Sequence, residues 1–385
     1  MYHIDIITLN QLNQIVSRID TIVQHSSVES LDNDTKEMIY TTARQINFQL
    51  YMSEVINIPI TDIESHLPIW TQSIERRKAP LPDCDFWGLY EYFKYVDKDT
   101  IYKNALAIFQ SYPEDYKREF LTLPNRYTFL TGKLDIETDN YSLISIYVKM
   151  MKDELDGFKS LYEKLADNRS KIILLRIVRF WFQFNLNDLL DLHETAFSDY
   201  FDLDLIQCNE NEVFADCGAY IGDTISDYIN TYGQNYKKIY AYEINDSSMA
   251  QLQSNLIAYN NIIYRQYGVG KCKDTMFLDD NLDGASSKVS NTGSKAIGIV
   301  SLDEDIKEPL TIIKMDIEGA EQEALLGSSR HIKEDKPKLM ICTYHKPEDL
   351  FQIPKLIENM RDDYKYYLRF NGRGIWPCDH VLFAI

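Results

Sequence analysis

Hydrophobic residues in the first half of the chain recur at spacings of three and four, as at Leu143, Ile144, Tyr147, Val148 and Met151. Side chains at these spacings share one face of an α-helix. Glycine is scarce before residue 205, and prolines gather in short connectors between the helical runs. The pattern predicts a mainly α-helical domain over residues 1–205.

One helical run, LADNRSKIILLRIVRFWFQFN at 165–185, is strongly apolar. Asp167 or Ser170 is suited to cap its amino end, so we expect the helix to begin there. Arg176 and Arg179 interrupt the run, which is also too short for the ~20 consecutive apolar residues that span a bilayer. We expect both arginines to face solvent or to pair with carboxylates.

From about residue 211 the pattern changes to short β-rich runs that alternate with helical ones. Such alternation with apolar strands is typical of a parallel sheet covered on both faces. The sequence therefore predicts a doubly wound, Rossmann-like α/β domain over residues 206–385, in which ligands bind beyond the carboxyl ends of the strands. The predicted strands are 212–217, 238–243, 262–267, 311–316, 338–343, 364–370 and 380–385, and the predicted helices are 223–231, 246–259, 319–327 and 348–360.

Length and charge narrow the class of protein. At 385 residues the chain exceeds the ~250 to 300 residues that one core organises, which supports two domains. Forty Lys and Arg against fifty-nine Asp and Glu give a net charge of −19, which repels nucleic acid and anionic membrane surfaces. The six cysteines include no C-x-x-C pair, and the amino terminus does not read as a signal peptide. We expect a cytoplasmic protein with no membrane span and no nucleic-acid partner.

The first predicted strand runs into the sequence DCGAYIGDT at residues 216–224. Gly218 and Gly222 let the backbone turn tightly and approach a ligand at the amino end of the next helix. The second strand ends at Glu243, where a carboxylate can accept both hydroxyl groups of a ribose. One glycine alone would satisfy a plain strand-to-helix turn, but the ordered pair of features predicts an adenosine-containing cofactor.

The charges around this turn favour S-adenosylmethionine over a dinucleotide. Dinucleotide binding uses G-x-G-x-x-G, and this chain offers only G-A-Y-I-G. Asp216 and Asp223 flank the turn and would repel a pyrophosphate, whereas they suit the ammonium and sulfonium charges of S-adenosylmethionine. We therefore predict S-adenosylmethionine as the cofactor.

Five motifs follow one another along the second half of the chain: VFADCGAYIGDT, IYAYEIND, IIKMDIEGAEQEALLGS, YHKPEDLFQIP and YKYYLRFN. With them, residues 165–385 resemble the FkbM-type methyltransferases, class I S-adenosylmethionine-dependent enzymes that are common in bacterial sugar, capsule and natural-product pathways. Five matches in family order are more specific than any single one. The resemblance does not extend to the first 160 residues.

The resemblance implies roles for individual residues of these motifs. Glu243 would hold the ribose of the cofactor, and Ile244 and Asn245 would lie near its adenine. The residues expected to line the methionine end are Asp216, Gly218, Tyr220, Gly222 and Asp223.

The acceptor side is expected at the ends of the fourth and fifth strands. Asp316 ends the fourth strand, and Glu318 would either bind substrate or only stabilise the start of the next helix. His345, after the fifth strand, suits the role of general base because a histidine pKa lies near neutrality, although it could instead fix the turn before Pro347. Asp316 is the rival base, and His380 is expected to pack within the last strand.

Three further features of the sequence bear on the site. Arg369 is predicted to bind an anionic acceptor, with an ordinary salt bridge as the alternative. Asp316, Glu318 and His345 could converge on a divalent ion, but the chain has no short-range ligand pair such as H-E-x-x-H, so we predict no metal. The Asp-, Ser-, Asn- and Gly-rich segment 279–296 is predicted to be a mobile lid, or else a functionless insertion.

These features predict an S-adenosylmethionine-dependent O-methyltransferase that acts on a hydroxyl group of a carbohydrate or sugar-derived metabolite. The carbohydrate is implied by the family resemblance. The helical region would build part of the acceptor site or a contact in a homodimer. One alternative is a non-catalytic S-adenosylmethionine-binding protein that acts in a partner complex. The other is an NAD-dependent oxidoreductase, which the missing glycine pattern disfavours.

Overall fold

The computed structural model describes residues 81–120, 132–190, 192, 197–278, 289–290, 295–372 and 376–385. The chain divides into two compact units, Met1–Ser111 with Phe182–Phe184, and Tyr112–Trp181 with Asn185–Ile385. The boundary predicted at residue 205 lies within the second unit, close to where helices give way to alternating strands and helices. The acceptor-site or oligomer role of the helical region stays a prediction.

The described part of the first unit is helical, with α5 (Leu81–Tyr95) and α6 (Lys98–Ser111). Aromatic rings join these helices to the short segment 182–184. The ring centroids of Phe93 and Phe182 lie 4.8 Å apart, and those of Phe109 and Phe184 lie 5.1 Å apart. These contacts place the last two residues of a later helix, and the residue that follows it, in this unit.

Helices also open the second unit, and the described ones confirm the predicted pattern. Leu143, Ile144, Tyr147, Val148 and Met151 are all buried along one helix, as their spacing predicts. The helices are α7 (Glu114–Glu119), α9 (Ser142–Asp153), α10 (Leu155–Lys164), α11 (Asn168–Gln183) and α12 (Leu186–Leu190). Among the described helices, none has both the length and the apolar character that crossing a bilayer requires.

Helix α11 begins where its sequence predicts and is tied to the central sheet. Asp167 Oδ1 accepts a hydrogen bond from the backbone N of Ser170 at 2.7 Å, which caps the helix. Ser170 Oγ in turn accepts from the backbone N of Leu368 at 2.8 Å. Arg179 pairs with Asp188 at 2.5 Å, one of the two environments expected for it. The hydrogen bond to Leu368 explains why this helix groups with the sheet.

A seven-stranded sheet with the order β10-β11-β9-β8-β1-β2-β3 forms the centre of the second unit. Its strands are β1 (Val213–Cys217), β2 (Lys238–Tyr242), β3 (Ile262–Arg265), β8 (Ile312–Met315), β9 (Lys338–Cys342), β10 (Tyr366–Phe370) and β11 (His380–Ala384). Strand β11 pairs antiparallel with both β9 and β10, and the other pairs are parallel. Every predicted strand is present, and the predicted Rossmann-like fold is confirmed.

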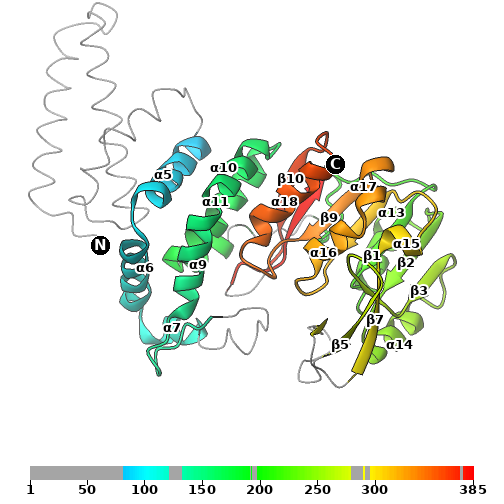
Figure 1. Cartoon of the computed structure of the whole chain (residues 1–385), viewed down its shortest axis with the longest axis horizontal. Coiled ribbons are helices and arrows are strands. Elements are labelled where there is room, and N and C mark those ends of the chain that lie inside the picture. Colours follow the sequence, from blue (N-terminus) through cyan, green and yellow to red (C-terminus); the bar gives the residue numbers. More distant parts are fainter. Residues whose placement is uncertain are drawn as a thin grey trace, which may run out of the picture. The chain divides into compact units, whose positions relative to one another are not determined.

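Four helices lie between the strands as predicted: α13 (Asp223–Tyr232), α14 (Asp246–Asn255), α16 (Glu321–Leu326) and α18 (Asp349–Met360) (Figure 1). The sheet core is apolar, with Phe214, Ile239 and Ile312 fully buried on three adjacent strands. Strand β1 lies between β2 and β8, where the strand order reverses. Its carboxyl end is therefore the expected position for a ligand.

A second, smaller sheet has the order β4-β7-β5-β6 and was not predicted from the sequence. Its strands are β4 (Gly268–Val269), β5 (Asp274–Leu278), β6 (Val289–Ser290) and β7 (Lys295–Val300). Most of the segment 279–296, predicted as a lid, lies outside the described residues. The described part of that segment contributes β6 and the first residues of β7.

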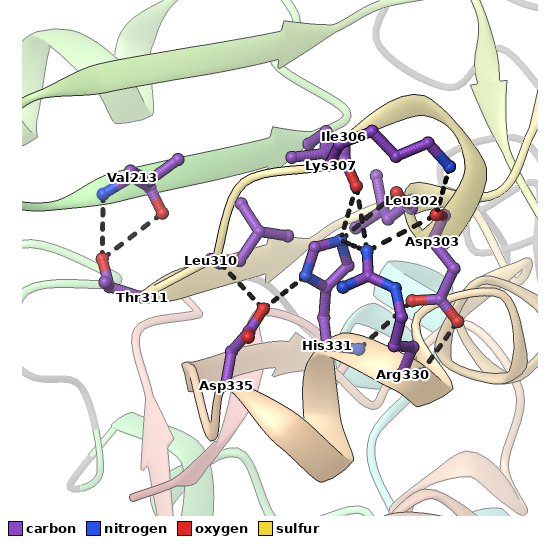
Figure 2. Close-up of polar contacts among 10 residues, drawn as sticks. All are labelled: Val213, Leu302, Asp303, Ile306, Lys307, Leu310, Thr311, Arg330, His331 and Asp335. Atoms are coloured by element: carbon purple, nitrogen blue, oxygen red, sulfur yellow. Dashed lines mark hydrogen bonds and ion pairs between the residues drawn. The ribbon is translucent and has the colours of Figure 1, made fainter.

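Two short helices, α15 (Leu302–Asp305) and α17 (Ser329–Glu334), anchor the amino end of β8. Figure 2 shows the buried His331, whose Nδ1 lies 2.6 Å from Asp335 Oδ2. The same oxygen accepts a hydrogen bond from the backbone N of Leu310 at 3.0 Å. Thr311 Oγ1 accepts one from the backbone N of Val213 at 2.9 Å. These bonds fix β8 against β1 at the end remote from the cavity described next.

Candidate functional site

A cavity of about 310 Å³ lies at the carboxyl ends of β1, β2 and β8, the place that the strand order indicates. The predicted site residues that line it are Gly218, Tyr220, Asp223, Glu243, Ile244, Asp316 and Glu318. The predicted site residues outside its lining are Asp216, Gly222, Asn245, His345 and Arg369. The cavity thus gathers most, and not all, of the expected side chains.

The turn after β1 needs both of its glycines, for different reasons. Gly218 has φ +81°, and a Cβ there would lie 1.9 Å from the backbone O of Asp316. Gly222 has φ +88°, and a Cβ there would lie 2.9 Å from Leu252 Cδ1. Gly218 therefore lets two strand ends approach at the cavity, whereas Gly222 lets the following helix pack on its neighbour.

Backbone amides hold the carboxylate of Glu243 in place beside the cavity. Glu243 Oε2 accepts a hydrogen bond from the backbone N of Tyr220 at 3.0 Å, and Oε1 accepts one from the backbone N of Asn245 at 2.6 Å. Burial raises the pKa of Glu243, and the amide donors act in the opposite direction. Each oxygen retains a further lone pair for a hydroxyl donor. The side chain of Asn245 instead caps α14 by accepting from the backbone N of Ser247 at 2.9 Å.

Asp216 does not present its charge to the cavity, which corrects the sequence interpretation. Its side chain is fully buried, and its Oδ1 lies 3.1 Å from Lys314 Nζ on the adjacent strand. Lys314 also donates to the backbone O of Gly218 at 2.8 Å. Burial alone would lower the pKa of Lys314, but the charges of Asp216 and Asp316 outweigh it and raise the pKa. Asp216 therefore stabilises the turn indirectly, through a buried ion pair with Lys314.

Asp316 lies between two tyrosine hydroxyl groups on the other side of the cavity. Tyr200 donates to Asp316 Oδ2 and Tyr344 donates to Asp316 Oδ1, both at 3.0 Å. Burial would raise the pKa of Asp316, but the charges of Lys314 and His345 and the two hydroxyl donors lower it. This carboxylate therefore stays ionised and faces the cavity.

His345 lies behind Asp316 within a group of carboxylates. Its Nδ1 is 2.9 Å from Glu321 Oε1, and its Nε2 is 3.4 Å from Asp316 Oδ1 and 3.6 Å from Glu318 Oε2. Burial would lower the pKa of His345, but these carboxylates outweigh it and raise the pKa to about 9. A protonated imidazole has no lone pair to accept a proton. In this arrangement His345 does not provide the neutral base that its sequence position suggested.

Carboxylates dominate the charge of the cavity wall. Among the described residues that line it, Lys314 is the one basic side chain. Burial, with the charges of Asp316 and Asp199, raises the pKa of Asp379 to about 6. The acidic lining residues are Asp199, Asp223, Glu243, Asp316, Glu318 and Asp379. Such a wall favours a cationic ligand and repels an anionic one.

One part of the wall is apolar and comes from elements that the sequence did not predict. Val269 of β4 and Ile299 of β7 line the cavity together with Ile244 and Tyr267. An apolar wall beside Glu243 would suit a purine whose ribose donates hydrogen bonds to that carboxylate. Tyr200 and Asp379 also line the cavity from loops, where no motif marked them.

Arg369 has a structural position, which corrects its predicted role in binding the acceptor. It is buried on β10, and its Nε lies 2.5 Å from Asp202 Oδ2. Its Nη2 lies 2.9 Å from Asp167 Oδ2, and its Nη1 donates to Ser170 Oγ at 3.0 Å. The alternative reading, an internal salt bridge, is the one observed. His380 is also buried, as predicted, with Nδ1 2.8 Å from Thr343 Oγ1.

Comparison with known proteins agrees with this geometry. Residues 216–368 match the family model of the methyltransferase FkbM domain. They are a methyltransferase FkbM domain. The match begins at Asp216, after β1 has started, and ends within β10, so the FkbM domain includes the strand ends that form the cavity. No curated protein matches the sequence.

Solved structures include a relative of the FkbM domain. The chain is similar to methyltransferase FkbM from Methylobacillus flagellatus, with 25% identity and a TM-score of 0.54. That similarity covers 62% of each chain, so this chain spans less than two thirds of that protein's length.

Two other solved structures are more distant from the FkbM domain. An rRNA methylase from Streptococcus thermophilus has 14% identity and a TM-score of 0.30, over 46% of this chain and 87% of that one. Fibrillarin from Aeropyrum pernix, solved with bound S-adenosyl-L-methionine, has 12% identity and a TM-score of 0.30, over 49% and 73%. Both similarities are too weak to bear on the activity of this chain.

Proposed function

We propose that this protein is an S-adenosylmethionine-dependent methyltransferase that methylates a hydroxyl group of a carbohydrate or sugar-derived metabolite. One observation carries the proposal. An acid-lined cavity lies within the FkbM domain, where the strand order of the sheet reverses. It lies beside the carboxylate of Glu243, which two backbone amides fix in place. When bound, S-adenosylmethionine supplies a methyl group on a positively charged sulfur.

The residues present fit this cofactor. Glu243 is oriented to accept the ribose hydroxyl groups, and Ile244, Val269 and Ile299 offer an apolar surface to the purine. Asp223 contributes negative charge for the ammonium and sulfonium groups at the methionine end. A pyrophosphate would instead meet the same carboxylates with like charge, which disfavours NAD.

The cavity wall also bears on the acceptor. Carboxylates and tyrosine hydroxyl groups can pair with the hydroxyl groups of a neutral sugar, whereas the acidic wall repels phosphate or uronate groups. Asp316 is the ionised side chain that faces the cavity on the side away from Glu243. It is placed to orient an acceptor hydroxyl and to receive its proton.

Transfer of a labelled methyl group tests this proposal. The full-length protein would be incubated with methyl-labelled S-adenosylmethionine and with glycans from cells that lack the protein. We expect label in a base-stable ether linkage, together with S-adenosylhomocysteine in equal amount. Cofactor binding without transfer to any glycan would support the non-catalytic alternative instead.

A further inference from the structure

We propose that the aromatic ring of Tyr220 binds the positively charged sulfur of S-adenosylmethionine, so that the cavity holds the charged methyl donor more tightly than the neutral product, S-adenosylhomocysteine. The role of Tyr220 rests on the proposed function, in which S-adenosylmethionine is the cofactor. It adds a residue that distinguishes the donor from the product.

The backbone of Tyr220 has a conformation that tyrosine rarely adopts. Its φ is +45°, within a turn that the backbone N of Gly222 closes by donating to the backbone O of Ala219 at 2.8 Å. A bulky side chain is strained at positive φ, where turns favour glycine or asparagine. Strained residues gather at functional sites, and Glu318 and Asp379, which also have positive φ, line the same cavity. The strain therefore points to a role for the side chain of Tyr220 at the cavity.

The fold itself makes little use of the Tyr220 side chain. The residue lines the cavity and is 36% exposed. Among the described residues, none forms a hydrogen bond with its hydroxyl group and no aromatic ring stacks on its ring. Two other tyrosines of the cavity wall differ, because Tyr242 donates to Asp305 at 2.6 Å and Tyr200 donates to Asp316 at 3.0 Å. The ring of Tyr220 is thus left for a ligand.

Tyr220 also lies beside the position that the sulfur would take. Its backbone N donates to Glu243 Oε2 at 3.0 Å, so the residue adjoins the carboxylate proposed to bind the ribose. In S-adenosylmethionine the sulfur is bonded to the 5′ carbon of that ribose, and its methyl group must face the acceptor. The turn of Tyr220 lies between Glu243 and Asp316, because Gly218 in the same turn approaches the backbone O of Asp316. The sulfur would therefore lie next to this turn.

An aromatic ring suits a sulfonium ion better than a hydrogen-bonding group does. The sulfur carries three carbon substituents and no proton, so it cannot donate a hydrogen bond. The face of a tyrosine ring attracts a cation within about 6 Å of the ring centroid. On transfer, the methyl group bonds to the acceptor oxygen, whose proton passes to Asp316, and the electron pair of the broken C–S bond stays on the sulfur. The sulfur is then neutral, so the ring holds the product less tightly.

Calorimetric titration of the full-length protein with S-adenosylmethionine and, separately, with S-adenosylhomocysteine tests this role. We expect Tyr220→Leu to weaken binding of S-adenosylmethionine by roughly 3- to 30-fold, and of S-adenosylhomocysteine by less than about twofold. Leucine keeps an apolar side chain and the backbone N that holds Glu243, but it removes the ring. Tyr220→Phe keeps the ring and should leave the ratio of the two dissociation constants within about twofold of the native value.

Tyr220→Gly separates the ring from the backbone strain. Glycine adopts positive φ freely, so this variant folds without the strain that tyrosine or leucine carries there. We expect it to lose the preference for S-adenosylmethionine to the same extent as Tyr220→Leu. A native ratio of dissociation constants in Tyr220→Gly would overturn the role of the ring.

Tyr267→Leu is the matched control. Tyr267 also lines the cavity and is 44% exposed, but it lies against β7, where a Cβ on Gly298 would come within 2.9 Å of Tyr267 Cδ1. This part of the wall would face the adenine, which both ligands share. Tyr267→Leu should therefore change both affinities by the same factor, with their ratio constant within about twofold.

Two results would contradict the role of Tyr220, and they differ in what they leave standing. If Tyr220→Leu changes both affinities equally, the ring does not detect the charge, and any preference for the donor comes from the acidic wall. The proposed function would then stand. If the native protein binds neither ligand, both the role of Tyr220 and the proposed function are rejected.

Discussion

The two sides of the cavity hold their carboxylates by different means. On the side of β2, backbone amides of Tyr220 and Asn245 fix Glu243. On the side of β8, side-chain hydroxyl groups of Tyr200 and Tyr344 fix Asp316. The first arrangement follows from the local course of the chain, whereas the second needs side chains from segments far apart in the sequence. Under the proposed function, the side of β2 is the cofactor side and the side of β8 is the acceptor side. The cofactor side is therefore expected to tolerate changes of nearby side chains better than the acceptor side does.

The largest effect is expected from a substitution of Gly218, in the turn after β1 that lies between the two sides of the cavity. In Gly218→Ala the new methyl group would lie 1.9 Å from the backbone O of Asp316, so β1 and β8 must separate. We expect loss of measurable S-adenosylhomocysteine binding and a fall in the free energy of unfolding of more than ~3 kcal/mol in urea.

Gly233→Ala is the control for this change. Gly233 also has positive φ, at +75°, but a Cβ there meets nothing within 4 Å. It should cost about 1 kcal/mol and leave cofactor binding intact. If both variants bind the cofactor equally well, the close approach at Gly218 does not shape the site.

Asp316→Asn is expected to lower the activity while leaving the affinity for the cofactor nearly unchanged. The amide keeps the size of the side chain but loses the charge that faces the cavity. We expect methyl transfer to fall by roughly 10²- to 10³-fold, because the carboxylate that would accept the proton is lost. The affinity for S-adenosylhomocysteine should change by less than about fivefold. A loss of cofactor affinity as large as the loss of activity would show that the two sides are not separate.

Glu243→Gln changes the cofactor side alone. Replacing the carboxylate weakens charge-assisted hydrogen bonds of about 1.5 to 3 kcal/mol, so S-adenosylhomocysteine affinity should fall by roughly 10- to 100-fold in calorimetry. Asp246→Asn is the matched control, since Asp246 follows the same strand but pairs with Lys295 at the surface. It should change the affinity by less than about twofold. Equal effects of the two variants would remove Glu243 from the site.

Asp379→Asn is expected to have the smallest effect, and it acts through pH. Burial and the charges of Asp316 and Asp199 raise the pKa of Asp379 to about 6, against the smaller opposite effects of Cys378 and His345. A raised carboxyl pKa means that stability is lost as pH rises through about 6. Because Asp379 is exposed to solvent, water screens these charges, and the variant should be more stable than the native protein at pH 7.5 by less than about 1 kcal/mol.

That gain in Asp379→Asn should vanish below about pH 4, where the native carboxyl is protonated in both states. Urea unfolding of both proteins at pH 4 and at pH 7.5 measures the difference. A variant that is less stable at both pH values would show that the ionised carboxylate of Asp379 is stabilising.

The cofactor side could be predicted from sequence because its residues follow strand ends directly. Gly218 and Glu243 stand where two apolar strands stop, and the order of the strands then brings them together. The prediction that Asp216 faces the cofactor was wrong for the same reason. A carboxylate near the end of a strand looks available, and only the register beside Lys314 shows that it is paired inside.

The residues predicted to act on the acceptor were harder to place from the sequence, because their contacts join distant segments. Arg369 pairs with Asp202 and Asp167, which lie 167 and 202 residues away in the chain. No local pattern distinguishes it from an arginine that binds a ligand. The nearness of His345 to Asp316 and Glu318 was predicted, but its shortest ion pair, with Glu321 at the start of α16, was not.

The most direct test of the account is a calorimetric titration of the full-length protein with S-adenosylmethionine and, in parallel, with NAD. An acid-lined cavity in which Glu243 accepts the ribose hydroxyl groups should bind one S-adenosylmethionine per chain, at least 100-fold more tightly than NAD, and Glu243→Gln should weaken that binding. Absence of S-adenosylmethionine binding, or tighter binding of NAD, would contradict the account.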